Sequence, residues 1–142
     1  MKYLISYIVM TMICINAHAQ ETREEWSKEL KKPNLNVEDV ATLLATQFNQ
    51  NKGKKIDSNT LSLGSTAIKK NINIDNQMTN QLNEAQIEKI KTTMPSLTSK
   101  QICSTPMMYV LVKEHGLTVS YRWYDLSMKE VLTSVVDATV CK

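Results

Sequence analysis

Apolar side chains recur every three or four residues in several stretches of the chain, which is the spacing of amphipathic helices. Asn36 stands as an N-cap before the first stretch, Pro95 is expected to end the second, and Gly116 suits the left-handed residue that follows a helix. The expected helices run from Asn36 to Phe48, from Thr79 to Met94, from Thr98 or Ser99 through Cys103, and from Thr105 to Gly116.

Elsewhere apolar and polar positions alternate, which is the period of a strand with one buried face. The expected strands run from Leu61 to Leu63, Ile68 to Ile74, Leu117 to Tyr124 and Lys129 to Val136, with Gly64-Ser65 separating the first two. The last strand is apolar on both faces, so it is expected to lie centrally or under a helix. The pattern predicts an α+β fold, with a small antiparallel sheet of three to four strands and helices packed on one face.

The first 19 residues have the pattern of a secretory signal peptide. Lys2 precedes an apolar run from Leu4 to Ile15, and Ala17-His18-Ala19 is an A-x-A cleavage pattern. The run is too short to span a bilayer as a stable helix, and Cys14 lacks the lipobox of a lipid-anchored protein. We therefore expect an exported chain that begins at Gln20 and resides in the periplasm or is secreted.

Without the leader the chain is small and nearly neutral. The full sequence has 17 basic and 14 acidic residues, so the loss of Lys2 leaves 16 basic residues and a net charge near +2. Charges of both signs are interspersed, and the cluster around Gly53 is interpreted as a solvated loop, which argues against nucleic-acid binding. We expect a charged N-terminal arm at 20–35, either a short helix or mobile, then a single α+β domain at 36–142 without a membrane span.

Two cysteines remain in the exported chain, Cys103 and Cys141. In an oxidising compartment such a pair in a small domain is most simply a structural disulfide, here between a helix and the C-terminal tail. The sequence has no CxxC motif and no metal-ligand spacing, so we predict neither metal nor cofactor. His115 is interpreted as a helix-end residue that bonds a free carbonyl or faces water.

Several of these residues occur in an order that resembles a group of small exported proteins of Gram-negative bacteria. The order is Cys103-x-x-Pro106, a helix ending at Gly116, Tyr121-x-x-Tyr124-Asp125 and a closing Cys141. It is similar to the quorum-sensing-regulated virulence factor family of Pseudomonas and to the alternative pilotin of type II secretion, over roughly residues 43–141. One departure is the turn Leu126-Ser127-Met128, which lacks the usual glycine.

The sequence contains no recognisable catalytic constellation. No serine lies in a G-x-S-x-G elbow, no glycine-rich loop could cradle a phosphate, and a bridged cysteine pair leaves His115 without a nucleophile. We therefore predict a binding protein. The resemblance implies that an envelope protein docks a helix or tail in a groove; the alternatives are a secreted virulence-associated effector and a periplasmic inhibitor or immunity protein.

Tyr109, Arg122 and Tyr124 are the candidate binding residues, because tyrosine and arginine are enriched at protein interfaces. Trp123 alternates with Arg122 and Tyr124 and shares a face with Val119, so it is interpreted as a core residue, with an interface role as the alternative. The expected partner is a protein in the envelope or outside the cell.

Overall fold

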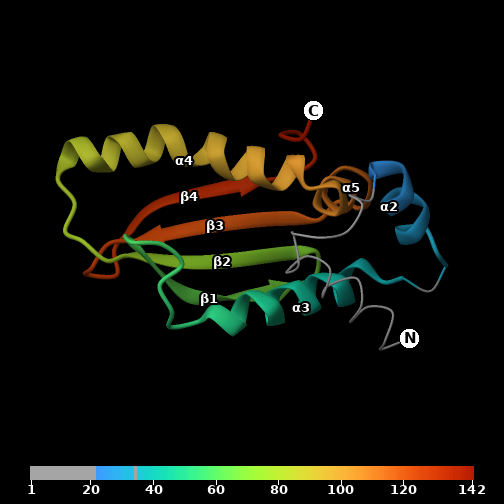
Figure 1. Ribbon diagram of the computed structural model, residues 1–142, viewed down its shortest axis with the longest axis horizontal. Helices are drawn as coiled ribbons and strands as arrows, with labels where there is room; N and C mark the ends of the chain where they lie inside the picture. The colour runs from blue at the N-terminus through green and yellow to red at the C-terminus, as the bar shows by residue number, and fades with distance from the viewer. Residues whose placement is uncertain (1–21, 34) are drawn as a thin grey trace.

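A computed structural model of the protein describes residues 22–33 and 35–142 (Figure 1). The predicted signal peptide lies outside the described residues. The described part has an α+β fold in which helices pack on one face of a four-stranded sheet, with one disulfide. The predicted fold class is therefore confirmed.

The helices are α2 (Arg23–Leu30), α3 (Val37–Phe48), α4 (Glu84–Ser104) and α5 (Pro106–His115), and a 3-10 turn spans Asn49–Asn51. Thr22 and Asn83 begin α2 and α4 through capping boxes, and the Asn36 side chain accepts a backbone N–H at the start of α3. α5 begins with a proline and ends at Gly116, whose φ of 71° is left-handed. The helices predicted after Asn36 and before Gly116 are confirmed.

The strands are β1 (Thr60–Ile68), β2 (Asn71–Met78), β3 (Thr118–Tyr124) and β4 (Glu130–Val136), and they lie side by side in that order. The two outer pairs are antiparallel as predicted, but the central pair of β2 and β3 is parallel, so the prediction of an entirely antiparallel sheet is corrected to a mixed one. The sheet is mixed because α4 and α5 form the connection between β2 and β3, and such a crossover returns the chain to the end from which β2 began.

One row of residues across the sheet shows that α3 and α4 cover the same face. Ser65, Ile74, Tyr121 and Ser134 are successive neighbours in the pairing. At one end of this row the Ser65 hydroxyl donates to Ala45 O of α3 at 2.6 Å. At the other end the Ser134 hydroxyl shares a hydrogen bond of 2.9 Å with Thr98 of α4. Figure 1 shows α3 along the β1 side of the sheet and α4 along the β4 side.

The main core lies where α5 meets the sheet. The row Ile72, Val119 and Val136 is fully buried and packs with the apolar face of α5. Trp26 and Leu30 of α2 belong to the same cluster, so the charged stretch after residue 20 contributes a helix to the core. Burying such side chains is the principal source of stability in a domain of this size.

Pro95 does not end a helix, contrary to the sequence prediction. α4 runs through it to Ser104, and Thr98 and Ser99 lie inside that helix, not at a new N-terminus. A proline removes one helical hydrogen bond and crowds the preceding turn. Helix geometry persists here because the later turns of α4 are held by tertiary contacts, and both hydroxyls donate to Pro95 O, at 3.1 and 2.7 Å.

Gly64 does not separate two strands either. β1 continues through it with a bulge between Ser62 and Gly64, and the turn into β2 comes at Lys69 and Lys70. Gly64 has a φ of 105°, and a Cβ there would lie 2.6 Å from Asn49 Oδ1. That oxygen accepts the Ser65 N–H at 2.7 Å, so the position needs glycine for backbone angle and for space.

β4 is an edge strand, although its apolar pattern predicted a position that is central or under a helix. The predicted covering helix is confirmed, because α4 packs against β4, whereas the predicted central position is wrong. Val136 and Ser134 are buried on the helix-covered face, whereas Val135 is 45% exposed on the other face. Its apolar residues on both faces therefore reflect one covered face and one partly exposed face.

Candidate binding surfaces

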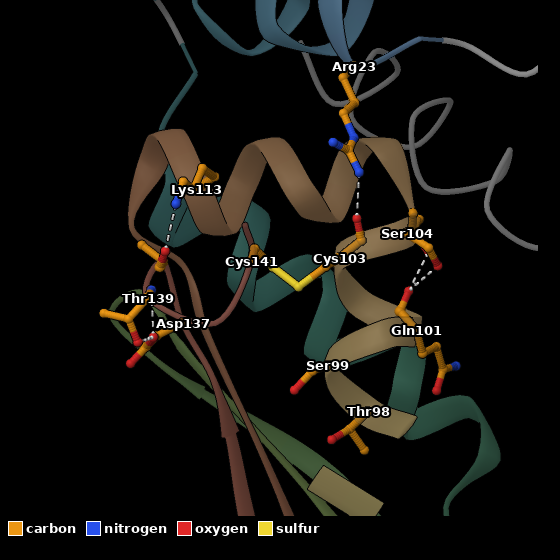
Figure 2. Close-up of a disulfide and its surroundings, with 12 residues drawn as sticks. Arg23, Thr98, Ser99, Gln101, Cys103, Ser104, Lys113, Asp137, Thr139 and Cys141 are labelled. Carbon is orange, nitrogen blue, oxygen red and sulfur yellow. Dashed lines mark hydrogen bonds between the residues drawn. A yellow bond between two sulfur atoms is a disulfide. The ribbon is translucent and has the colours of Figure 1, made fainter. Parts of the chain in front are cut away.

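The disulfide joins the end of α4 to the C-terminal tail, as predicted. The Cys103 and Cys141 sulfurs are 1.99 Å apart, and Cys141 is fully buried (Figure 2). Two further contacts hold the same region. Arg23 donates to Cys103 O at 3.0 Å, and Lys113 donates to Ala138 O at 3.0 Å. Because both sulfurs are bonded, neither cysteine is a free nucleophile.

Tyr109, the first candidate binding residue, lies apart from the other two. It is half-buried on α5, and the Arg23 guanidinium of α2 lies 3.7 Å from its ring centroid. This is cation–π geometry, and the same arginine bonds Cys103 O. In the structure Tyr109 therefore helps to hold α2 on α5.

Arg122 and Tyr124 share the face of the sheet that no described helix covers, which we call the outer face. Arg122 forms a bidentate ion pair with Asp75, with N···O distances of 2.6 and 2.8 Å. These hydrogen bonds to the carboxylate raise the pKa of Arg122, so the guanidinium is a fixed cation. Gln77 and Glu130 flank Tyr124 in the pairing, and all of these side chains alternate with residues of the core face.

Trp123 is a core residue. It is 3% exposed and stacks on Tyr121, with ring centroids 5.7 Å apart and an interplanar angle of 16°. Burial raises the pKa of Tyr121 to about 12, because the charged phenolate would lose its hydration there. Asn76 pairs with Trp123 in the register and is also buried, so this end of the core face is more polar than the end at α5.

The part of α4 before Pro95, together with Leu97 just after it, carries an apolar stripe that the core does not bury. Its members recur at intervals of three and four residues and are Ile87, Ile90, Met94 and Leu97, which we call the α4 stripe. The first three are half-buried and Leu97 is 52% exposed. Within α4 the buried residues are Thr98 and Ile102, both after Pro95. The stripe is thus a partly covered apolar face of a kind that partner proteins use.

His115 lies at the end of α5 as predicted, and the residue is half-buried. Its Nε2 atom is buried and has no hydrogen-bond partner in the part of the chain that the structure describes. Its backbone oxygen instead accepts a hydrogen bond from Lys70 Nζ at 3.2 Å.

Among residues 22–33 and 35–142 no group of histidine, cysteine and carboxylate side chains is arranged to hold a metal ion. The same residues contain no helix of sufficient length and hydrophobicity to cross a bilayer. The titratable groups with lowered pKa values, such as Glu114 bonded by Ser27 and Asp137 bonded by Thr139, lie at solvent-exposed helix and turn contacts. Their roles are structural.

Solved structures of a protein inferred to be secreted and of secretion pilotins have a similar fold. A solved structure of PA3611 from Pseudomonas aeruginosa, a protein inferred to be secreted, matches with a TM-score of 0.62 and 14% identity, covering 75% of this chain and 93% of PA3611. EpsS, a pilotin of the Vibrio vulnificus type 2 secretion system, matches with a TM-score of 0.61 and 11% identity, covering 84% of this chain and 97% of EpsS.

AspS, the type II secretion pilotin of Vibrio cholerae, matches with a TM-score of 0.57 and 12% identity, over 74% of this chain and 92% of AspS. These likenesses confirm the structural resemblance that the cysteine, proline and glycine positions indicate, and at such identities they show the fold. No protein-family model matches the chain, and no curated protein matches it at a significant level.

Sequence reasoning did not identify the α4 stripe as a surface. Apolar residues at this spacing in the expected helix from Thr79 to Met94 ordinarily face a core, so the pattern alone does not mark Ile90 and Met94 as a surface. The outer face was easier to predict, since alternation in β3 places Arg122 and Tyr124 opposite Trp123.

Proposed function

We propose that this chain is a non-enzymatic, exported accessory protein of a bacterial envelope, pilotin-like, that acts by binding another protein. The observation that carries the proposal is the partly exposed α4 stripe, in a fold shared with two type II secretion pilotins. The partner we propose is an amphipathic helix or tail of an envelope protein, whose apolar side chains would cover the stripe.

The chemistry of the described residues supports a binding role over catalysis. Nucleophilic or acid–base catalysis needs a nucleophile and a base within hydrogen-bond reach of each other. Here the cysteines are bonded to each other, and His115 Nε2 has no partner. Asp75, the best-positioned carboxylate of the outer face, is paired with Arg122.

The outer face is a second candidate surface, with Arg122 and Tyr124 as its proposed contact residues. The fold that the chain shares with PA3611 favours this surface for the alternative function, a secreted effector that meets a target outside the producing cell. Tyr109 would join a partner contact only if α2 moved away, because Arg23 covers its ring.

A pull-down separates these functions. The tagged chain would be expressed from its full coding sequence in a Gram-negative host, and envelope and culture-medium fractions would be captured natively and identified by mass spectrometry. Two double variants would be run in parallel: Ile90→Ser with Leu97→Ser on the α4 stripe, and Arg122→Ala with Tyr124→Ala on the outer face. Circular dichroism would verify that each variant is folded.

The accessory proposal expects one dominant envelope protein that is retained by the wild type and by the outer-face variant but lost from the α4 variant. Retention by both variants would overturn the assignment of the α4 stripe. Recovery mainly from medium, with a target lost only from the outer-face variant, would replace the accessory function by the secreted one.

A further inference from the structure

Two loops lie beside the end of β2, at the end of the sheet farthest from α5 (Figure 1). Thr79 N–H donates to Asn59 O at 2.9 Å, and Gln77 Nε2 contacts both Asp125 O and Met128 Sδ at 3.3 Å. The loop before β1 and the β3–β4 turn therefore lie beside the end of β2, as Figure 1 also shows. We call residues 52–59 and 125–129 the loop end.

Three large apolar side chains project from the loop end into solvent. Ile56 is 51% exposed, and Leu126 and Met128 are each 52% exposed. All three belong to the loop end and none is part of the buried core. Exposed apolar side chains at one end of a molecule can insert into the headgroup layer of a membrane.

Met128 is also held in an unfavourable backbone conformation. Its φ of 61° is in the left-handed region, where a residue with a Cβ is strained and glycine is favoured. Strain of this kind occurs preferentially where a side chain has a function. A methionine in place of glycine adds a flexible apolar side chain to the tip of the turn.

The polar groups around the tip favour an anionic partner. The lysines Lys52, Lys54, Lys55 and Lys129 are exposed, and none forms an ion pair among the described residues. The four lysines outnumber the three nearby carboxylates, each of which accepts hydrogen bonds from its own neighbourhood. Asp57 accepts from Asn59 N–H at 2.7 Å, Asp125 from Ser127 and Lys129 N–H at 2.8 and 2.9 Å, and Glu130 from the Thr133 hydroxyl at 2.8 Å.

We propose that the loop end is a contact site for anionic phospholipid membranes. Leu126, Met128 and Ile56 insert shallowly at the headgroup level while the lysine ammonium groups meet lipid phosphates. Three apolar side chains and a few lysines give weak, reversible binding, because each lysine near such a surface adds only modest attraction. The site is independent of the α4 stripe, so it adds a membrane contact to a protein-binding chain.

Vesicle flotation of the purified exported chain tests the proposal. The probes are phosphatidylglycerol–phosphatidylethanolamine vesicles and neutral phosphatidylcholine vesicles, each at low and high salt. Leu126→Ser is expected to lower the apparent partition coefficient for the anionic vesicles roughly tenfold. Ile68→Ser is the matched control, because Ile68 is also an exposed apolar residue, at 64%, but lies at the opposite end of β1.

Met128→Gly gives a readout that a purely structural position would not give. It is expected to raise the melting temperature by a few degrees, because the strain is relieved. It should also weaken anionic-vesicle binding roughly fivefold. A lowered melting temperature would show that the left-handed conformation of Met128 is not strained, which would contradict the proposal.

Binding to anionic vesicles at low salt that is lost at high salt, weakened by Leu126→Ser and unchanged in Ile68→Ser would support the site. Absence of flotation, equal flotation with neutral vesicles, or an equal weakening in Ile68→Ser would each overturn it. None of these outcomes bears on the pull-down, because loss of vesicle binding in Leu126→Ser leaves the α4 stripe intact.

Discussion

The two halves of α4 have different environments although they form one continuous helix. After Pro95, Thr98 and Ile102 are buried and Cys103 is bonded to the C-terminal tail. Before Pro95 the helix has its capping box at Asn83 and no buried residue. The second half is thus anchored to the domain, while the first half is supported chiefly by local helical interactions.

This comparison shows that one part of a helix can be anchored to the domain while another part of the same helix is available to a partner. Local opening free energies follow the density of buried apolar contacts. The first half should therefore open more readily than the second, and its apolar side chains are the ones left for a partner to bury. The following variants test this division, beginning with the largest expected effect.

Removing the disulfide should have the largest effect. The double variant Cys103→Ser with Cys141→Ser is expected to lose about 4 kcal/mol, because the bridge closes a loop with a sequence separation of 38 and restricts the unfolded chain. Chemical denaturation of both proteins measures the difference. An unchanged midpoint would show that the second half of α4 is anchored by packing alone.

The two isoleucines of α4 offer a matched comparison. Ile102→Ala should cost about 3 kcal/mol, since Ile102 is 4% exposed and its removal leaves a cavity. Ile90→Ala, in the half-buried stripe, should cost less than about 1 kcal/mol. Equal losses in urea denaturation would contradict the division of the helix.

Tyr121 reports on the boundary between the halves, because it pairs with Ser134, which bonds Thr98. Its phenol has a pKa raised from 10.0 to about 12 by burial. The unfolded chain would ionise first, so this stability is complete below pH 10 and is lost as the pH rises toward 12, by up to about 3 kcal/mol.

The measurement is a phenolate absorbance titration of the wild type and of Tyr121→Phe. The wild type should show one additional ionisation near pH 12, within the range where circular dichroism shows a folded chain. An additional ionisation near pH 10 would mean that the boundary is open to water.

The smallest effect is expected from the hydroxyl that joins α4 to β4. Thr98→Val should cost about 1 kcal/mol, because it leaves the buried Ser134 hydroxyl without this partner. Thr92→Val is the control, since Thr92 is exposed and bonds only carbonyls of its own helix. If the control lost as much as Thr98→Val, the contact across to the sheet would contribute nothing.

Features with local signals could be predicted from the sequence. The cap at Asn36, the proline and glycine that delimit α5, and the pairing of two cysteines each depend on neighbouring residues or on compartment chemistry. Arg122 and Tyr124 were correctly placed on one face because a strand alternates. Whether they bind a partner stays a prediction.

The incorrect predictions concern positions where contacts with residues distant in sequence outweigh a local signal that usually ends a helix or strand. Pro95 and Gly64 usually end an element, but the tethered second half of α4 and the Asn49 side chain hold both elements together. Whether Tyr109 binds a partner stays a prediction, but nothing near it in the sequence indicates that Arg23 lies above its ring. The parallel pairing of β2 and β3 had a readable signal in the length of the connection between them.

The Asn49 side chain has a consequence for how this protein behaves when many copies are crowded together. Its amide donates to Ser65 O and accepts from Ser65 N–H, which are the two bonds that a neighbouring strand would make to β1. Gly53 and Lys54 make similar backbone bonds to Ser62. The border of β1 from Ser62 to Ser65 is therefore already capped, which opposes the addition of a strand from another copy along this stretch.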